Sequence, residues 1–137
     1  MTVLVTGGAG YIGSHMVLAL RDAGETVVVL DDLSTGVRDA VPPEVELVVG
    51  DVSDESLVSS LIERMGINEL AHFAARIVVP DSVADPIGYY LANPAKTRTL
   101  LATAIANGVT RVIFSSTAAV YGEPETSPVA EDAPTVP

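Results

Sequence analysis

The feature that most constrains the fold is a glycine-rich turn near the start of the chain. Residues 6–14 read TGGAGYIGS, so Gly7, Gly10 and Gly13 recur at intervals of three. An apolar run precedes the turn, and apolar side chains at helical spacing follow it. In such a strand–turn–helix unit the glycines permit a tight turn, close approach to a pyrophosphate and close helix packing. The turn therefore predicts a nucleotide-binding βαβ unit, although such a turn can also be purely structural.

Short apolar runs alternate with helical patterns along the chain, which is typical of βαβ units and a parallel sheet. We expect five strands, at residues 2–6, 26–30, 45–49, 69–73 and 111–115. We also expect helices at residues 12–23, at 57–65 with Ser53 or Asp54 as N-cap, and from Asn93-Pro94 to Gly108. The pattern predicts an α/β fold: an incomplete Rossmann-type doubly wound parallel sheet of about five strands, in the order 3-2-1-4-5.

Composition excludes several classes of protein. The chain of 137 residues is 48% hydrophobic, so we expect most of it to be folded, and no apolar run is long enough to cross a membrane. Eighteen acidic against seven basic residues give a net charge of −11, which disfavours a nucleic-acid partner. The absence of cysteine excludes disulfides and thiolate metal sites. No secretory signal opens the sequence, and we expect a cytoplasmic protein.

Carboxylates follow the second and third expected strands. Asp31 and Asp32 lie eighteen and nineteen residues beyond Gly13, near the offset at which a carboxylate contacts the ribose hydroxyls of NAD. A carboxylate at this position repels a 2′-phosphate, so NAD is favoured over NADP. Asp51 follows the third strand in Gly50-Asp51-Val52. It could accept a hydrogen bond from an adenine amino group or help to cap the next helix, and the residues alone leave both alternatives open.

Three hydroxyl residues, Ser115, Ser116 and Thr117, follow the fifth strand in FSSTAAVYG. Hydroxyls at a strand end often bond only the local backbone. Ligands of doubly wound sheets bind at the carboxyl ends of the strands, however, so we expect these side chains to face the ligand. His15 and His72 have no further ligand at metal-binding spacing, which favours structural roles and predicts no metal site.

These motifs, in this order, resemble the extended short-chain dehydrogenase/reductase family over essentially the whole chain. The segments that carry the resemblance are TGGAGYIGSH, VVVLDDLSTG, GDVSD, HFAA and FSSTAAVYG. Within the family, the resemblance is to enzymes that epimerise nucleotide sugars at C4. It implies a tightly held NAD that takes a hydride from a UDP-hexose and returns it to the other face of a 4-keto intermediate. UDP-glucose and UDP-galactose would thereby interconvert, in an enzyme expected to be a homodimer.

The resemblance also implies roles for individual residues. The implied cofactor contacts, from the pyrophosphate to the nicotinamide, are Gly7, Gly10, Tyr11, Ile12, Gly13, Asp31, Asp32, Asp51, Val52, Phe73, Ala74, Ala75 and Ser115. Thr117 would be the catalytic hydroxyl that bonds the C4 oxygen of the sugar and relays its proton. Residues 1–121 would be the N-terminal part of the NAD-binding domain, and residues 122–137 an acidic, proline-rich loop leading to a missing catalytic helix.

The sequence also departs from the family pattern. No Tyr-x-x-x-Lys motif is present, although in this family its tyrosine takes the proton, so we expect an N-terminal fragment that is inactive alone. Pro94 and Lys96 replace residues of the usual Asn-Val-x-Gly-Thr helix entry, and Ile77 replaces a frequent lysine. One alternative is a non-catalytic NAD-binding module. Another is a fragment of a nucleotide-sugar 4,6-dehydratase, which Ala118-Ala119 disfavours because those enzymes carry Asp-Glu there.

Overall fold

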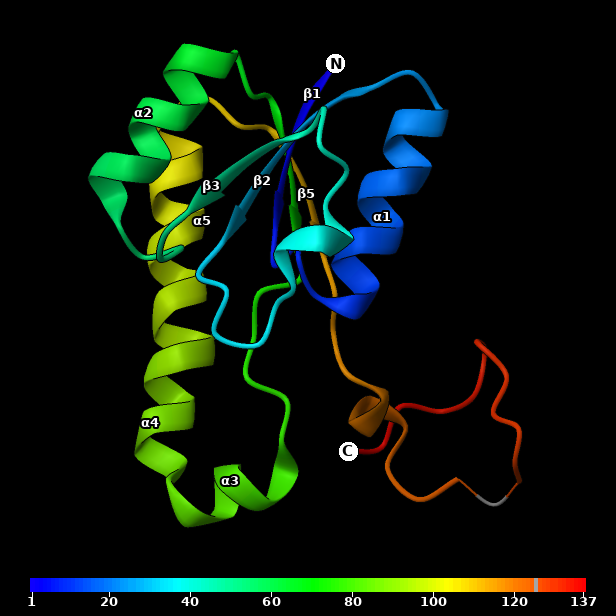
Figure 1. Ribbon diagram of the computed structural model, residues 1–137. Helices are drawn as coiled ribbons and strands as arrows, with labels where there is room; N and C mark the ends of the chain where they lie inside the picture. Colours follow the sequence, from blue (N-terminus) through cyan, green and yellow to red (C-terminus); the bar gives the residue numbers. More distant parts are fainter. Residues whose placement is uncertain (125) are drawn as a thin grey trace.

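The computed structural model describes residues 1–124 and 126–137. Its strands are β1 (Thr2–Thr6), β2 (Thr26–Asp31), β3 (Glu46–Val49), β4 (Glu69–His72) and β5 (Arg111–Phe114). All four neighbouring pairs are parallel, and the strand order is β3-β2-β1-β4-β5 (Figure 1). The predicted doubly wound sheet is therefore confirmed. Each strand boundary lies within one residue of the prediction.

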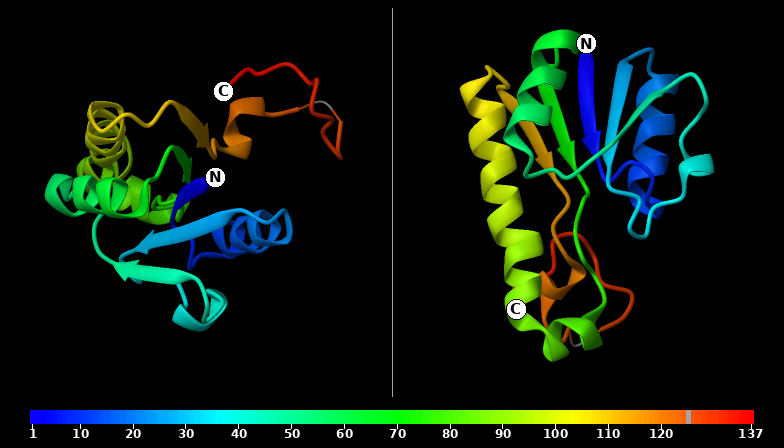
Figure 2. Two further views of the ribbon diagram at one scale, coloured as in Figure 1. Left: turned by 90° about the horizontal axis from the view of Figure 1, so that it is seen from above. Right: turned by 60° about the vertical axis from the view of Figure 1, so that its left-hand side comes forward.

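Helices cover the two faces of the sheet unequally. Helix α1 (Tyr11–Asp22) covers one face, and α2 (Glu55–Met65) and α5 (Lys96–Ala106) cover the other (Figures 1 and 2). Alternate residues of β1 supply the two cores: Leu4 packs with the α2 and α5 side, whereas Val5 packs with Val17 of α1. Burial on both faces explains why β1 and β2 read as continuous apolar runs.

The helix after β3 begins where the sequence allowed two alternatives. Asp54, rather than Ser53, is the N-cap of α2, and its Oδ1 accepts a hydrogen bond from the backbone N–H of Leu57 at 3.0 Å. Gly66 ends the helix with a left-handed φ of 60°, a conformation that glycine adopts without the steric cost of a side chain.

The predicted start of the next helix, at Asn93-Pro94, is wrong. The helix begins with α4 (Pro86–Tyr90), passes through the π-helical segment η2 (Leu91–Ala95) and continues into α5. Asp85 caps the helix and Pro86 occupies the first helical position. The start signal is therefore Asp85-Pro86, eight residues before the predicted one. Pro94 lies inside η2, and the wider π turn accommodates a residue that cannot donate a backbone hydrogen bond.

Three short helices were not expected from the sequence: η1 (Arg38–Ala40), α3 (Val79–Ala84) and η3 (Ala118–Tyr121). Residues 122–124 and 126–137 contain no helix or strand and lie beyond the carboxyl end of β5, apart from α1 (Figures 1 and 2). Strand β5 forms one edge of the sheet, and its Val112, Ile113 and Phe114 are exposed. None of the described helices is long and apolar enough to cross a membrane.

Candidate functional site

The glycine turn joins β1 to α1 with backbone packed directly against backbone. Gly7 has a left-handed φ of 72°, and its N–H donates to the Leu30 carbonyl at 2.9 Å. A Cβ built on Gly7 would lie 2.5–2.8 Å from backbone atoms of Phe73 and Ala74. A Cβ on Gly13 would overlap the carbonyl oxygen of Gly7. The turn therefore has no room for side chains at either position.

The N-terminus of α1 is suited to an anion. Gly10 is its N-cap, no side-chain cap is present among the described residues, and the first turn carries no acidic residue. Tyr11 and Ile12, which lie in that turn, are 83% and 61% exposed. Free N–H groups and the positive end of the helix dipole attract phosphate groups, so the residues present fit a pyrophosphate.

The structure separates the two aspartates that follow β2. Asp31 is only 7% exposed, and its carboxylate accepts hydrogen bonds from the N–H groups of Ala9 and Leu33, both at 2.9 Å. It thereby ties the loop after β2 to the glycine turn. Asp32 is exposed and accepts only a local hydrogen bond from Ser34. Of the two, Asp31 is the one held beside the turn.

Asp51 lies just beyond β3, and both of its carboxylate oxygens are engaged. Oδ1 accepts hydrogen bonds from the N–H and hydroxyl of Ser53, at 2.8 and 2.7 Å, and Oδ2 forms an ion pair with Lys96. Burial would raise the pKa of Asp51, but the hydrogen bonds from Lys96 and Ser53 and the lysine charge lower it. Because Asp54 caps α2, the side chain of Asp51 is not the helix cap.

A cavity of about 440 Å³ lies beyond the carboxyl ends of β4 and β5. Several residues expected at the site line it, namely Phe73, Ala74, Ala75, Ser115, Ser116 and Thr117. Thr117 is exposed, and its Oγ1 accepts a hydrogen bond from the N–H of Ala119 at 3.2 Å. The hydroxyl can therefore still donate to a group in the cavity. The HFAA segment and the strand-five hydroxyls thus face one space.

His72 lines this cavity, and the sequence did not indicate which side chains it contacts. It is the last residue of β4 and is 2% exposed. Its Nδ1 lies 2.6 Å from the Thr6 hydroxyl and its Nε2 lies 2.9 Å from that of Thr97, while its ring stacks on Phe114. Burial lowers the pKa of His72 to about 4. The one available signal was a histidine that follows apolar residues near the end of the expected strand.

The neutral state of His72 predicts a pH-dependent stability. The unfolded chain gains a proton near the usual histidine pKa, whereas the folded chain resists protonation until pH is near 4. The free energy of unfolding should therefore fall as pH falls, by about 2 kcal/mol between roughly pH 7.5 and pH 5. Urea unfolding across this range measures the change.

The matched comparison uses the two histidines of the chain. His72→Gln should remove the part of the fall in the free energy of unfolding that comes from His72. His15→Gln, at an exposed position on α1, should retain it. If the free energy of unfolding changed with pH equally in His72→Gln and in the unaltered protein, the change would not come from His72.

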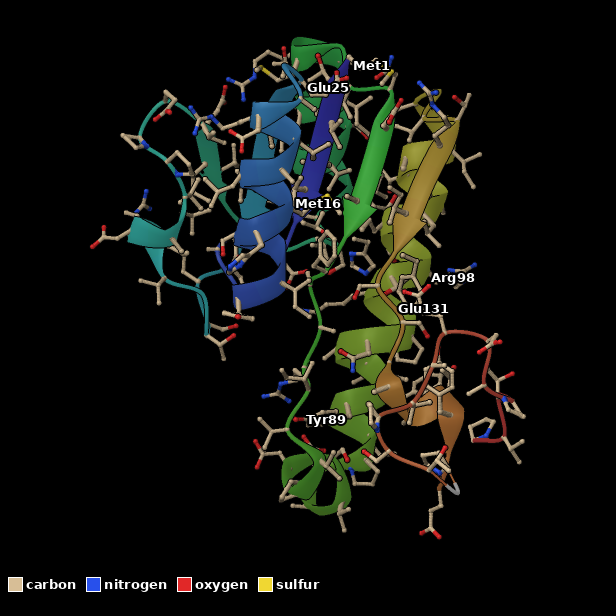
Figure 3. All side chains as sticks on the ribbon, turned by 90° about the vertical axis from the view of Figure 1, so that its right-hand side faces the viewer. Met1, Met16, Glu25, Tyr89, Arg98 and Glu131 are labelled. Atoms are coloured by element: carbon tan, nitrogen blue, oxygen red, sulfur yellow. The ribbon has the colours of Figure 1, made fainter. Side chains whose placement is uncertain are left out.

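Two side chains of the long helix hold the loop that follows β4. Asn93 accepts from the N–H of Arg76 at 2.8 Å and donates to its carbonyl at 2.9 Å. The Tyr89 hydroxyl accepts from the N–H of Val78 at 3.1 Å and donates to its carbonyl at 2.7 Å. Figure 3 shows Tyr89 on α4 beside this loop. The sequence did not indicate these hydrogen bonds, because they join side chains of the helix to backbone groups of a loop far away in the sequence.

The sheet order and the glycine turn at the point where that order reverses define a Rossmann-type α/β protein. Residues 3–137 match the family model described as "NAD dependent epimerase/dehydratase family". The chain belongs to this family.

Relatives of known activity agree with the resemblance seen in the motifs. The chain is 53% identical to the UDP-glucose 4-epimerase of Azospirillum brasilense, over 98% of this chain and 39% of the relative. A solved UDP-glucose 4-epimerase from Thermus thermophilus, in complex with NAD, matches with TM-score 0.89 and 40% identity, over 100% of this chain and 45% of that one.

A second solved structure comes from Stenotrophomonas maltophila and contains NAD and formylated UDP-arabinopyranose. It matches with TM-score 0.89 and 36% identity, over 99% of this chain and 43% of that one. The chain spans about 40% of the length of the curated relatives that it matches.

Proposed function

We propose that this chain forms the NAD-binding part of a UDP-glucose 4-epimerase. The observation that carries the proposal is the shared cavity of Thr117, Ser115 and the HFAA segment, next to a glycine turn with no room for side chains. Relatives named UDP-glucose 4-epimerase, and solved structures that contain NAD, support it. A homodimer, expected from the resemblance, and a cytoplasmic location, expected from the sequence, stay predictions.

In this proposal the chain binds NAD along the carboxyl edge of the sheet. Gly7, Gly10 and Gly13 allow the pyrophosphate to approach the N-terminus of α1. Asp31 accepts hydrogen bonds from the adenosine ribose. Each carboxylate oxygen can accept more than one bond, so the bonds from Ala9 and Leu33 leave acceptor sites for the ribose hydroxyls.

The cavity beyond β4 and β5 would take the nicotinamide and the hexose of a UDP-sugar. Bound NAD supplies a hydride acceptor for C4 of the sugar. Thr117 would hydrogen-bond the C4 hydroxyl and relay its proton to the tyrosine of a Tyr-x-x-x-Lys motif, which these residues lack and the rest of the enzyme would have to supply. Its hydroxyl hydrogen is available for this, because the bond from Ala119 uses only the oxygen as acceptor. A non-catalytic NAD-binding module is the second candidate, favoured by the absence of Tyr-x-x-x-Lys from these residues.

A chimeric enzyme tests the catalytic proposal. Residues 3–137 would replace the matching segment of the A. brasilense epimerase, whose remaining sequence is kept. We expect the purified chimera to interconvert UDP-glucose and UDP-galactose. Thr117→Ala should lower its kcat about 100-fold, because the hydroxyl that positions the proton is lost. A coupled assay for UDP-glucose measures the rate.

Thr117→Ser is the matched control, because it keeps the hydroxyl, and its kcat should stay within about tenfold of the unaltered chimera. A chimera that folds and binds NAD but has no activity would contradict the epimerase proposal and favour the non-catalytic module. Full activity in Thr117→Ala would refute the role of Thr117 alone.

A further inference from the structure

The ion pair between Lys96 and Asp51 joins two elements at the edge of the sheet where the proposed cofactor site lies. Lys96 is the first residue of α5 and the only lysine in the chain. Its Nζ contacts Oδ2 of Asp51, the second residue after β3. The two side chains are 36% and 41% exposed, so a ligand can reach both of them.

Neighbouring contacts hold this pair in place. Ser53 bonds the other oxygen of Asp51 through both its N–H and its hydroxyl, which fixes the carboxylate. Thr97, next to Lys96, lies 2.9 Å from Nε2 of His72 at the end of β4. Adjacent residues of α5 are thus tied to the ends of β3 and β4, so the ammonium group lies at the carboxyl edge of the sheet.

The pair offers complementary hydrogen-bonding groups side by side. The carboxylate of Asp51 can still accept a hydrogen bond, and an ammonium group has three donors, of which the ion pair uses one. Adenine presents an amino donor beside a ring-nitrogen acceptor. Hypoxanthine presents the reverse, a ring N–H donor beside a carbonyl acceptor at position 6. A carboxylate alone would repel that carbonyl oxygen, whereas an adjacent ammonium group can donate to it.

We propose that Lys96 is a specificity-determining residue for the purine base: paired with Asp51, it lets the site bind a 6-oxopurine dinucleotide nearly as well as a 6-aminopurine one. The proposal rests on the proposed binding of NAD, with the adenine next to Asp51.

Isothermal titration calorimetry with two probes tests this role, namely NAD and nicotinamide hypoxanthine dinucleotide. For the unaltered protein we expect the two Kd values to agree within about threefold. Lys96→Met should weaken binding of the hypoxanthine dinucleotide about tenfold more than binding of NAD, because the 6-oxo group is then left without a donor beside a carboxylate, whereas the 6-amino group of adenine keeps Asp51 as its acceptor. The ratio of the two Kd values is therefore the readout, since a general loss of structure would weaken both equally.

Two further variants separate the role of the donor from that of charge. Lys96→Arg keeps a cationic donor and should keep the ratio near that of the unaltered protein. Arg98→Met removes an exposed positive charge two residues along α5 and should also leave the ratio unchanged. If Lys96→Met still binds NAD and leaves the ratio of the two Kd values unchanged, the role of Lys96 is refuted while the proposed function stands. If the unaltered protein binds neither dinucleotide, the proposed function itself fails.

Discussion

Gly7→Ala is expected to destabilise the protein by about 3 kcal/mol or more and to abolish measurable NAD binding. Two causes act together at this position. The left-handed φ of 72° is unfavourable for alanine, and the new Cβ would lie within 2.8 Å of the backbone of Phe73 and Ala74. Backbone atoms cannot move aside as a flexible side chain can, so the end of β4 and the turn must separate. Urea unfolding and calorimetry with NAD measure the two effects.

Gly24→Ala is the matched control for the backbone conformation. Gly24 has a similar φ of 79°, but a Cβ there would have no atom within 4 Å. We expect it to cost only about 1 kcal/mol, from the left-handed φ alone, and to leave NAD affinity unchanged. Equal destabilisation by the two variants would show that the close approach at Gly7 contributes nothing.

Asp31→Ala is expected to lower NAD affinity at least about 100-fold and to destabilise the protein by about 2–4 kcal/mol. The stability loss arises because the N–H groups of Ala9 and Leu33 lose their acceptor where Asp31 is buried. The affinity loss is expected because, in the proposed binding mode, the ribose would lose its acceptor, and because the glycine turn loses the hydrogen bond that Asp31 accepts from Ala9. Calorimetry with NAD and with NADP gives both affinities.

Asp32→Ala is the control, because Asp32 carries the same charge one residue further on but is exposed. Its loss should change stability by less than about 1 kcal/mol. The unaltered protein and Asp32→Ala should both prefer NAD to NADP by at least about tenfold, whereas Asp31→Ala should lose this preference. A larger loss of NAD affinity in Asp32→Ala than in Asp31→Ala would contradict the assignment of the ribose contact to Asp31.

Local signals in the sequence predicted most of the fold, but they misplaced the start of one long helix and did not predict three short ones. The apolar runs predicted five strands to within one residue. For β1 and β2 the reason is that a strand covered on both faces needs continuous apolar side chains. Asn93-Pro94 looked like a helix start because proline is favoured at the first helical position. The same signal occurs at Asp85-Pro86, where the helix begins. The choice between them depends on the contacts of Tyr89 and Asn93 with the loop after β4.

The sequence by itself determined the parallel sheet, its strand order and the glycine turn, because periodicity and turn residues act over short distances along the chain. Its motifs also carried the resemblance to the family. Only the tertiary structure decided which aspartate is buried beside the turn, and which residues His72 and Lys96 contact. Thr97 is 25 residues from His72, and Asp51 is 45 residues from Lys96. Such pairs meet only when strands and helices pack, and no local pattern records which side chains then face each other.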